Sequence, residues 1–77
     1  MTGASGAELV RIELNGKSTE LPAPATVADA VRAAGASPDG RGLAVAVGGE
    51  VVQRAAWEER RLQEGERVEV LHAVQGG

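Results

Sequence analysis

Hydrophobic and polar side chains alternate along residues 8–14. A period of two is typical of a half-buried strand, whose buried face would carry Val10, Ile12 and Leu14. Asn15-Gly16 follows, and both residues tolerate the positive φ of a tight hairpin turn. Residues 17–21 are then predicted to return as the second strand of a hairpin. Pro22 and Pro24 are expected to end this strand, because proline cannot donate to a sheet ladder.

The hydrophobic period changes to that of a helix after Thr26. Thr26 and Asp29 have the spacing of a shortened capping box, and Gly35 suits a left-handed C-terminal cap. A helix of about nine residues is not stable alone in water. We therefore expect it to pack on the sheet through one apolar stripe, formed by Val27, Ala30, Val31 and Ala34.

Three further strands are predicted in the second half of the chain, at residues 43–47, 50–53 and 67–74. A Pro-Asp-Gly turn precedes the first, and Gly48-Gly49 makes a tight turn into the second. The inward-facing residues are expected to be Leu43, Val45, Val47, Val68 and Val70. The outer face of residues 43–47 carries only alanine, so that side is either covered or meets a partner.

Residues 54–62 form the segment that is hardest to assign. One helical turn is expected there, with Trp57 and Leu62 closing the open end of the core. The element order then predicts an α+β fold in which one helix packs across one face of a small mixed sheet. The helical connection is expected to return the chain as a parallel neighbour in that sheet.

The chain has the length of one domain, which we place at residues 8–74. Residues 1–7 are small and polar and are expected to be a disordered extension, and residues 75–77 a flexible tail. The first residues lack the features of a secretion signal. No apolar run approaches the roughly 20 residues of a membrane helix. We therefore expect a cytoplasmic protein that does not enter a membrane.

Composition excludes several classes of function. A net charge of −3 and one aromatic residue argue against a nucleic-acid partner. Without cysteine and with one histidine, the chain has neither a Cys-His pair nor a multi-His metal set. No Walker-type glycine loop occurs, so ATP is not expected to bind to this chain. We expect a protein that is not itself an enzyme and holds no metal.

The tail Gln75-Gly76-Gly77 is the strongest candidate for covalent chemistry. Glycine has no Cβ, so Gly76 lets the tail thread a narrow channel in a partner. The Gly77 carboxylate is a poor electrophile that becomes reactive once it is converted to a mixed anhydride. The alternative interpretation is a frayed end without a role. Composition alone does not separate the two, but a strand directly before the glycines favours the reactive tail.

Four more residues are candidate partner contacts. Val74 and His72 lie beside the tail, although a strand histidine is more often a packing or surface residue. Trp57 is either a partner anchor or a structural lid on a small core. Arg54 forms a candidate docking patch with three other arginines, Arg60, Arg61 and Arg67.

The second half of the chain carries a family resemblance. Residues 43–52 read Leu-Ala-Val-Ala-Val-Gly-Gly-Glu-Val-Val, and Arg54 and Trp57 follow. The chain then ends in His-Ala-Val-Gln-Gly-Gly at residues 72–77. With this arrangement the chain resembles the sulfur carrier proteins of thiamine biosynthesis, the ThiS family, over residues 9–77. It departs from the usual asparagine, proline and aspartate of that family at turn or edge positions, namely Gly48, Gln53 and Glu66.

The resemblance implies a ubiquitin-like β-grasp fold, with a mixed sheet of four to five strands and the last strand beside the first at its centre. It also implies that a ubiquitin-activating-type adenylyltransferase uses Mg-ATP to convert the Gly77 carboxylate to an acyl-adenylate. A persulfide sulfur, from a cysteine desulfurase or another donor, would then replace AMP and leave a thiocarboxylate. Thiazole synthase would accept that sulfur. The chain would be a carrier with no bound cofactor.

Two alternatives remain beside thiamine-pathway sulfur transfer. The first is a related carrier that serves molybdopterin or another sulfur-containing metabolite. The second is a non-covalent ubiquitin-like binding module whose glycines are inert. That module would have a partner footprint around Ala44 and Ala46, and its binding would survive removal of Gly76-Gly77.

Overall fold

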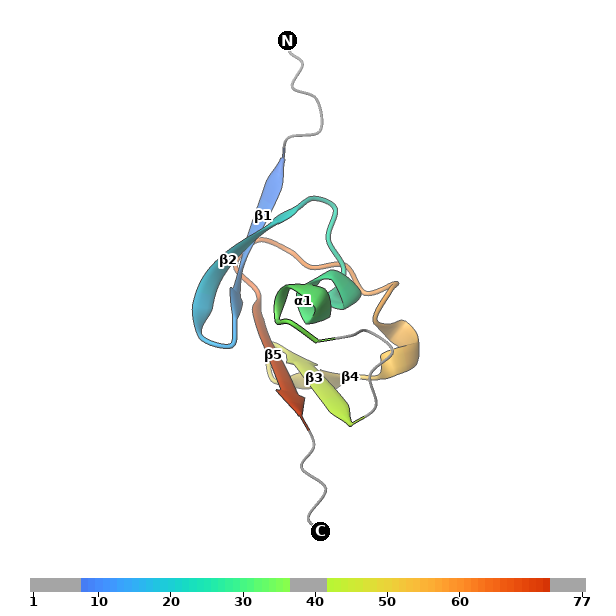
Figure 1. Ribbon diagram of the computed structural model, residues 1–77. Coiled ribbons are helices and arrows are strands. Elements are labelled where there is room, and N and C mark those ends of the chain that lie inside the picture. The colour runs from blue at the N-terminus through green and yellow to red at the C-terminus, as the bar shows by residue number, and fades with distance from the viewer. Residues whose placement is uncertain (1–7, 37–41, 73–77) are drawn as a thin grey trace.

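One helix lies across one face of a five-stranded sheet in the computed structural model, which describes residues 8–36 and 42–72 (Figure 1). The helical segments are α1 (Val27–Ala33) and the short 3-10 turn η1 (Arg54–Ala56). The strands are β1 (Leu9–Leu14), β2 (Lys17–Pro22), β3 (Leu43–Val47), β4 (Glu50–Val52) and β5 (Arg67–His72). This architecture confirms the expected α+β class.

The last strand occupies the centre of the sheet, whose order is β2-β1-β5-β3-β4. β5 runs parallel to β1, and the other neighbouring strands are antiparallel. The helical connection returns β3 parallel to β2 as predicted, but the prediction that the two strands are neighbours is wrong, because β1 and β5 lie between them. Each hairpin pairs locally at its own edge, and the final strand fills the gap between the two hairpins.

The hairpin turns have the backbone that their residues predict. Asn15 has a φ of +51° and Gly16 a φ of +84°, so both adopt the left-handed conformation of a type I′ turn. Gly48 and Gly49 likewise have positive φ, at +60° and +88°. Register within each of the two hairpins follows from its turn. The buried side chains of β1 and β3 belong to the same core.

Local capping signals hold α1 in place as predicted. The Thr26 N–H donates to Asp29 Oδ2 at 2.9 Å, and the Asp29 N–H donates to Thr26 Oγ1 at 3.4 Å, which confirms the capping box. Gly35 has a φ of +87° directly after the C-cap residue Ala34, as expected for a left-handed cap. The helix therefore begins and ends where its flanking residues direct it.

The core lies between α1 and the inner face of the sheet. Trp57 and Leu62 close one end of it as expected, and both are buried. The Trp57 indole Nε1–H donates to the Val52 carbonyl at 2.8 Å, which satisfies the polar atom of a side chain that is 2% exposed. Most of the other buried residues come from the predicted faces: Val10, Ile12, Leu14, Val27, Ala30, Val31, Val45, Val47, Val68 and Val70. Leu21, Ala25 and Ala28 are buried as well, whereas Ala34 of the predicted helix stripe is exposed, because it is the C-cap residue after the end of α1.

Strand bounds differ slightly from those expected. β2 continues through Pro22, which lies opposite Leu9, because β2 is an edge strand and tolerates a missing donor. β4 ends at Val52 instead of residue 53. Residues 73 and 74 of the predicted last strand, the extension 1–7, the Pro-Asp-Gly turn and the tail 75–77 lie outside the described residues. Among the described residues, no helix has the length and apolar character that a membrane crossing requires.

Candidate functional site

β5 is the element that leads to the predicted reactive tail. It pairs with β1 on one side and with β3 on the other, and its inward residues Val68 and Val70 are buried. His72 is its last residue and is exposed. The tail residues Val74, Gln75, Gly76 and Gly77 lie outside the described residues. The described part of the site is therefore the anchored strand directly before them.

Asn15 extends the contact between β1 and β5 beyond the end of β1. β1 pairs with β5 only at Glu13 and Leu14. The Asn15 N–H then donates to the Val68 carbonyl at 2.9 Å, and its side-chain Oδ1 accepts the Val70 N–H at 2.8 Å. From the sequence, Asn15 is predicted only as a turn residue. Nothing in its local pattern indicates that the side chain reaches a strand 55 residues away.

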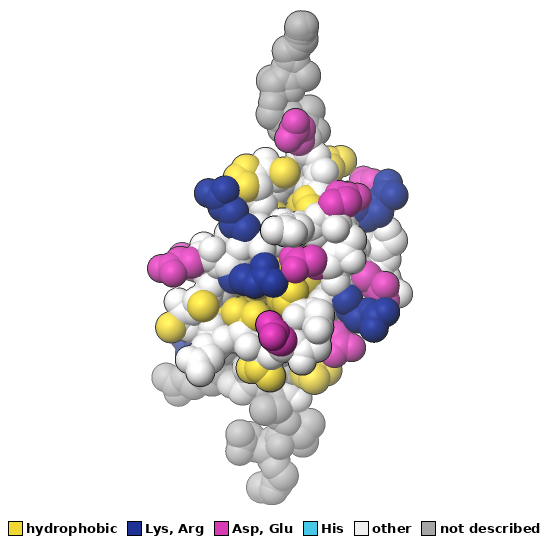
Figure 2. Space-filling model, turned by 180° about the vertical axis from the view of Figure 1, so that it is seen from behind, with side chains coloured by type: hydrophobic (Ala, Val, Ile, Leu, Met, Phe, Trp, Pro, Cys, Tyr) yellow, Lys and Arg dark blue, Asp and Glu magenta, His cyan; other side chains and the backbone are white. Residues whose placement is uncertain are grey.

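The outer face of the sheet carries an apolar patch near the end of β5. Leu71 is 58% exposed and lies opposite Ala44, and Val51 is 75% exposed and lies opposite Ala46. We call these four residues the outer patch. Figure 2 shows hydrophobic side chains gathered on the lower part of this face, toward the end of the chain. The alanine face of β3 thus continues into larger exposed apolar side chains.

The two remaining predicted contacts are placed differently. Trp57 is only 2% exposed and therefore offers no surface to a partner. It acts as a structural lid and not as a partner contact. Arg54 is exposed at the start of η1. β4 runs parallel to β5, so Arg54, two residues beyond the end of β4, lies toward the same end of the sheet as His72.

Arg54 does not gather with Arg60 and Arg67 into the predicted docking patch. Arg60 forms an ion pair with Glu66 at 3.0 Å, and Arg67 lies 3.8 Å from a Glu13 carboxylate oxygen. Both contacts are at the beginning of β5, whereas Arg54 lies beyond the end of β4. Their charges are therefore divided between the two ends of the sheet.

Glu66 organises the segment that leads into β5. Its Oε1 accepts the Gln63 N–H at 2.8 Å, and its Oε2 accepts from the Arg60 guanidinium at 3.0 Å. Partial burial raises the pKa of Glu66, but these two hydrogen bonds and the positive charge of Arg60 together hold that pKa below its usual value. The carboxylate is thus ionised at neutral pH and ties residues 60–66 together.

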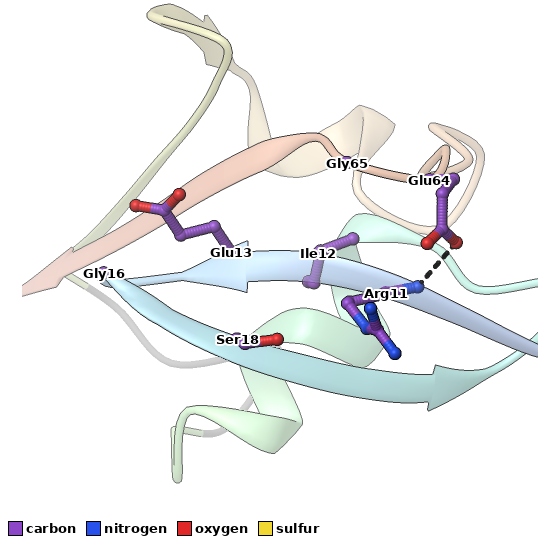
Figure 3. A pocket seen from close by; sticks show the side chains of 7 residues that line it. All are labelled: Arg11, Ile12, Glu13, Gly16, Ser18, Glu64 and Gly65. Atoms are coloured by element: carbon purple, nitrogen blue, oxygen red, sulfur yellow. Dashed lines mark hydrogen bonds between the residues drawn. The ribbon is translucent and has the colours of Figure 1, made fainter.

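An open groove of about 440 Å³ lies beside this segment, between the first hairpin and residues 64–65 (Figure 3). The charged groups that line it already have partners. Glu64 Oε1 accepts the Arg11 N–H at 2.9 Å, and the Arg11 guanidinium pairs with Glu20 at 3.1 Å. No group of three or more potential metal ligands occurs among the residues that the structure describes. The groove therefore presents no set of unpaired groups for a ligand.

Comparison with known proteins places this geometry in a family. The solved structure of the thiamine biosynthesis protein ThiS from Geobacter metallireducens is similar to this chain, with a TM-score of 0.70 and 24% sequence identity. The similarity covers 88% of this chain and 100% of that chain, and it shows that the two share the β-grasp fold. A search of curated proteins found no match. The sequence profile of the ThiS family matches residues 7–77, and the chain belongs to the ThiS family.

Proposed function

We propose that this protein is a sulfur carrier of thiamine biosynthesis whose Gly77 carboxylate is adenylated and then converted to a thiocarboxylate. The observation that carries the proposal is the ThiS family match, whose range of residues 7–77 includes Gly76 and Gly77. The anchored strand β5 supports it, because the tail follows directly from the centre of the sheet. The carrier acts as a cosubstrate and its partners supply the catalytic groups.

The proposed chemistry needs little from the carrier beyond its carboxylate. In the partner, a Gly77 carboxylate oxygen attacks the α-phosphorus of ATP, and pyrophosphate leaves. A persulfide sulfur then attacks the acyl-adenylate carbonyl and displaces AMP. Cleavage of the remaining S–S bond by a thiol reductant leaves the thiocarboxylate. The chain has no cysteine, so no thiol of its own competes for the activated carbonyl.

The length of the tail limits where the partner makes contact. Residues 73–77, fully extended, reach about 17 Å from the end of β5. An enzyme that holds Gly77 in its active site must therefore touch the body of the carrier near His72. The exposed Leu71 of the outer patch lies at this end of the sheet. We expect the adenylyltransferase and thiazole synthase to use that end in turn.

Intact-mass measurement tests the proposal. The protein is incubated with ATP, the cognate adenylyltransferase and a persulfide source, and we expect the mass of one oxygen-to-sulfur exchange. Removal of Gly77 should abolish the exchange. Removal of residues 1–6, which precede the family match, is the control and should leave it intact. Thiolation of the chain without Gly77 would contradict the proposed site.

A second measurement addresses the acceptor. The thiolated carrier is mixed with thiazole synthase and its other substrates, and sulfur transfer is followed as the return of the unmodified mass. A carrier that is thiolated but transfers nothing to thiazole synthase would retain the carrier function and refute the thiamine assignment. An intact chain that is never thiolated would instead favour the non-covalent binding module.

A further inference from the structure

We propose that Asn15 is a positioning residue for the reactive tail, because its carboxamide holds β5 at Val70 and so sets the point beyond which β5 is held from one side only. The inference rests on the proposed function of Gly77. Under this proposal Asn15, a residue of the first hairpin, helps to present the Gly77 carboxylate, which is 62 positions later in the chain.

The topology leaves a gap that Asn15 fills. β1 ends at Leu14, and the hairpin turn then carries the chain away from β5 into β2. The Val70 N–H points toward β1, where no further strand residue is available. Asn15 Oδ1 accepts this N–H at 2.8 Å in a partly buried position. A side-chain oxygen thereby takes the place of the backbone carbonyl that another residue of β1 would supply.

The conformation of Asn15 makes this contact specific to its residue type. Its φ of +51° is a left-handed value that asparagine, aspartate and glycine adopt most readily. Of these three, only asparagine and aspartate also carry an oxygen that can accept the Val70 N–H. The Asn15 backbone N–H bonds to the Val68 carbonyl at 2.9 Å in addition. Asn15 therefore adopts the backbone conformation of the turn and also bonds to two residues of β5, Val68 and Val70.

Beyond Val70, β5 is held from one side only. Leu71 and His72 lie opposite Ala44 and Leu43 of β3. Backbone groups of a strand alternate between its two neighbours, so the His72 N–H points to the same side as that of Val70, where β1 no longer runs. Val70 is thus the last residue held from both sides, and the residues from Leu71 to Gly77 reach about 23 Å from it. Without the carboxamide, the last such residue is Val68.

Three variants separate this role from a general effect on stability. Asn15→Gly keeps the left-handed turn and removes only the acceptor. Asn15→Asp restores an acceptor at the same position. Thr26→Ala is the matched control, because it removes the N-cap of α1, which lowers stability by an amount similar to one lost hydrogen bond and does not touch β5. Steady-state ATP–pyrophosphate exchange with the adenylyltransferase gives KM and kcat for each carrier.

For Asn15→Gly we expect a rise in KM of roughly threefold to tenfold with kcat within twofold of the wild-type value, as the loss of one net hydrogen bond implies. Asn15→Asp and Thr26→Ala should both stay within twofold in KM. This pattern supports the positioning role. An unchanged KM for Asn15→Gly, an equal rise for Thr26→Ala, or a failure of Asn15→Asp to restore KM overturns it.

Amide hydrogen exchange on the unmodified protein tests the same contact without partner or variant. Val70 and His72 direct their N–H groups to the same side of β5, so the Asn15 bond predicts slow exchange at Val70 and fast exchange at His72. Equal rates at the two amides would overturn the proposal. Amide exchange does not depend on thiolation. Equal exchange rates would therefore refute only the role of Asn15, whereas a wild-type chain that is never thiolated would refute the carrier function.

Discussion

The two ends of β5 are built differently. At the upstream end, residues 60–67, backbone and charged hydrogen bonds connect the strand to its neighbours: Glu13 N–H to the Glu66 carbonyl at 2.9 Å, Gly65 N–H to the Arg11 carbonyl at 2.7 Å, and the Arg60–Glu66 pair. At the downstream end, residues 70–72, the side facing β1 is held by the Asn15 carboxamide, and an exposed leucine stands beside it.

The difference indicates which end of β5 contributes to stability and which end is available to a partner. The upstream end is well bonded and buries Leu62, so changes there should alter the free energy of unfolding. The downstream end exposes Leu71 and is held only by β3 beyond Val70, so changes at its exposed side chains should alter partner binding with little loss of stability. Four predictions break that separation or sharpen it.

The largest effect is expected from Trp57→Ala, which opens the segment ahead of β5. Removal of a buried tryptophan leaves a cavity and costs about 3–5 kcal/mol. The Val52 carbonyl also loses its indole donor. Urea unfolding measures the loss, and Trp57→Phe, which keeps most of the apolar volume, should cost less. If the Trp57→Ala protein that remains folded has a raised KM with the adenylyltransferase, the separation between the two ends is wrong.

Glu66→Gln should have the next largest effect, and its effect depends on pH. Because the pKa of Glu66 is lowered in the folded protein, the carboxylate stabilises the fold above its unfolded-state pKa of about 4.3, and this stabilisation is lost as the pH falls through the lower folded value. Loss of its charged hydrogen bonds should cost about 1–2 kcal/mol at pH 7.

Urea unfolding of the wild type and of Glu66→Gln at pH 7 and pH 3 checks this prediction. The stability difference between them should shrink at the lower pH, because Glu66 of the unfolded chain is then largely protonated and the stabilisation by the ionised carboxylate is partly lost. A difference that is equal at both pH values would show that the ionised form of Glu66 does not contribute.

Leu71→Ser should separate partner binding from stability at the downstream end. The side chain is 58% exposed, so the free energy of unfolding should change by less than about 0.5 kcal/mol. The apparent KM with the adenylyltransferase should rise several-fold if the partner covers this end. Leu9→Ser is the matched control, since Leu9 is 55% exposed at the beginning of β1. Equal KM values for both variants would exclude contact at Leu71.

The smallest effect is expected at the Glu13–Arg67 pair. Its charged atoms are 3.8 Å apart and both side chains are largely exposed. Solvent-screened pairs of this kind typically contribute little, and a double-mutant cycle of Glu13→Gln and Arg67→Met should give a coupling below about 0.5 kcal/mol. A larger coupling would mean that this surface pair contributes to the anchoring of β5.

Local patterns predicted most of the elements correctly. The Thr26–Asp29 box, the Asn15-Gly16 turn and the alternation in β1 depend on neighbouring residues, and the structure confirms each of them. The lid formed by Trp57 was also predictable, because a core this small has few places for an indole.

Non-local pairing explains what local patterns did not predict. The central position of β5 depends on contacts across the whole chain, so only the family resemblance implied it, and the structure confirms it. The reach of Asn15 to Val70 and the two bonds of Glu66 follow from that same register. The sequence could identify Asn15 and Glu66 as polar residues in turns, but not which strand each would support. The role of Gly77 stays a prediction.

The stagger between β1 and β5 gives the molecule two functionally distinct poles. Because the strands are parallel and overlap only at residues 13–14 and 67–68, Leu9 and His72 lie at opposite ends of the body, about 30 Å apart. A label, a bead or a surface attached on the Leu9 side would leave the other pole accessible in solution. An immobilised array of this protein would therefore present every molecule with the His72 end of β5 outward, in a uniform orientation.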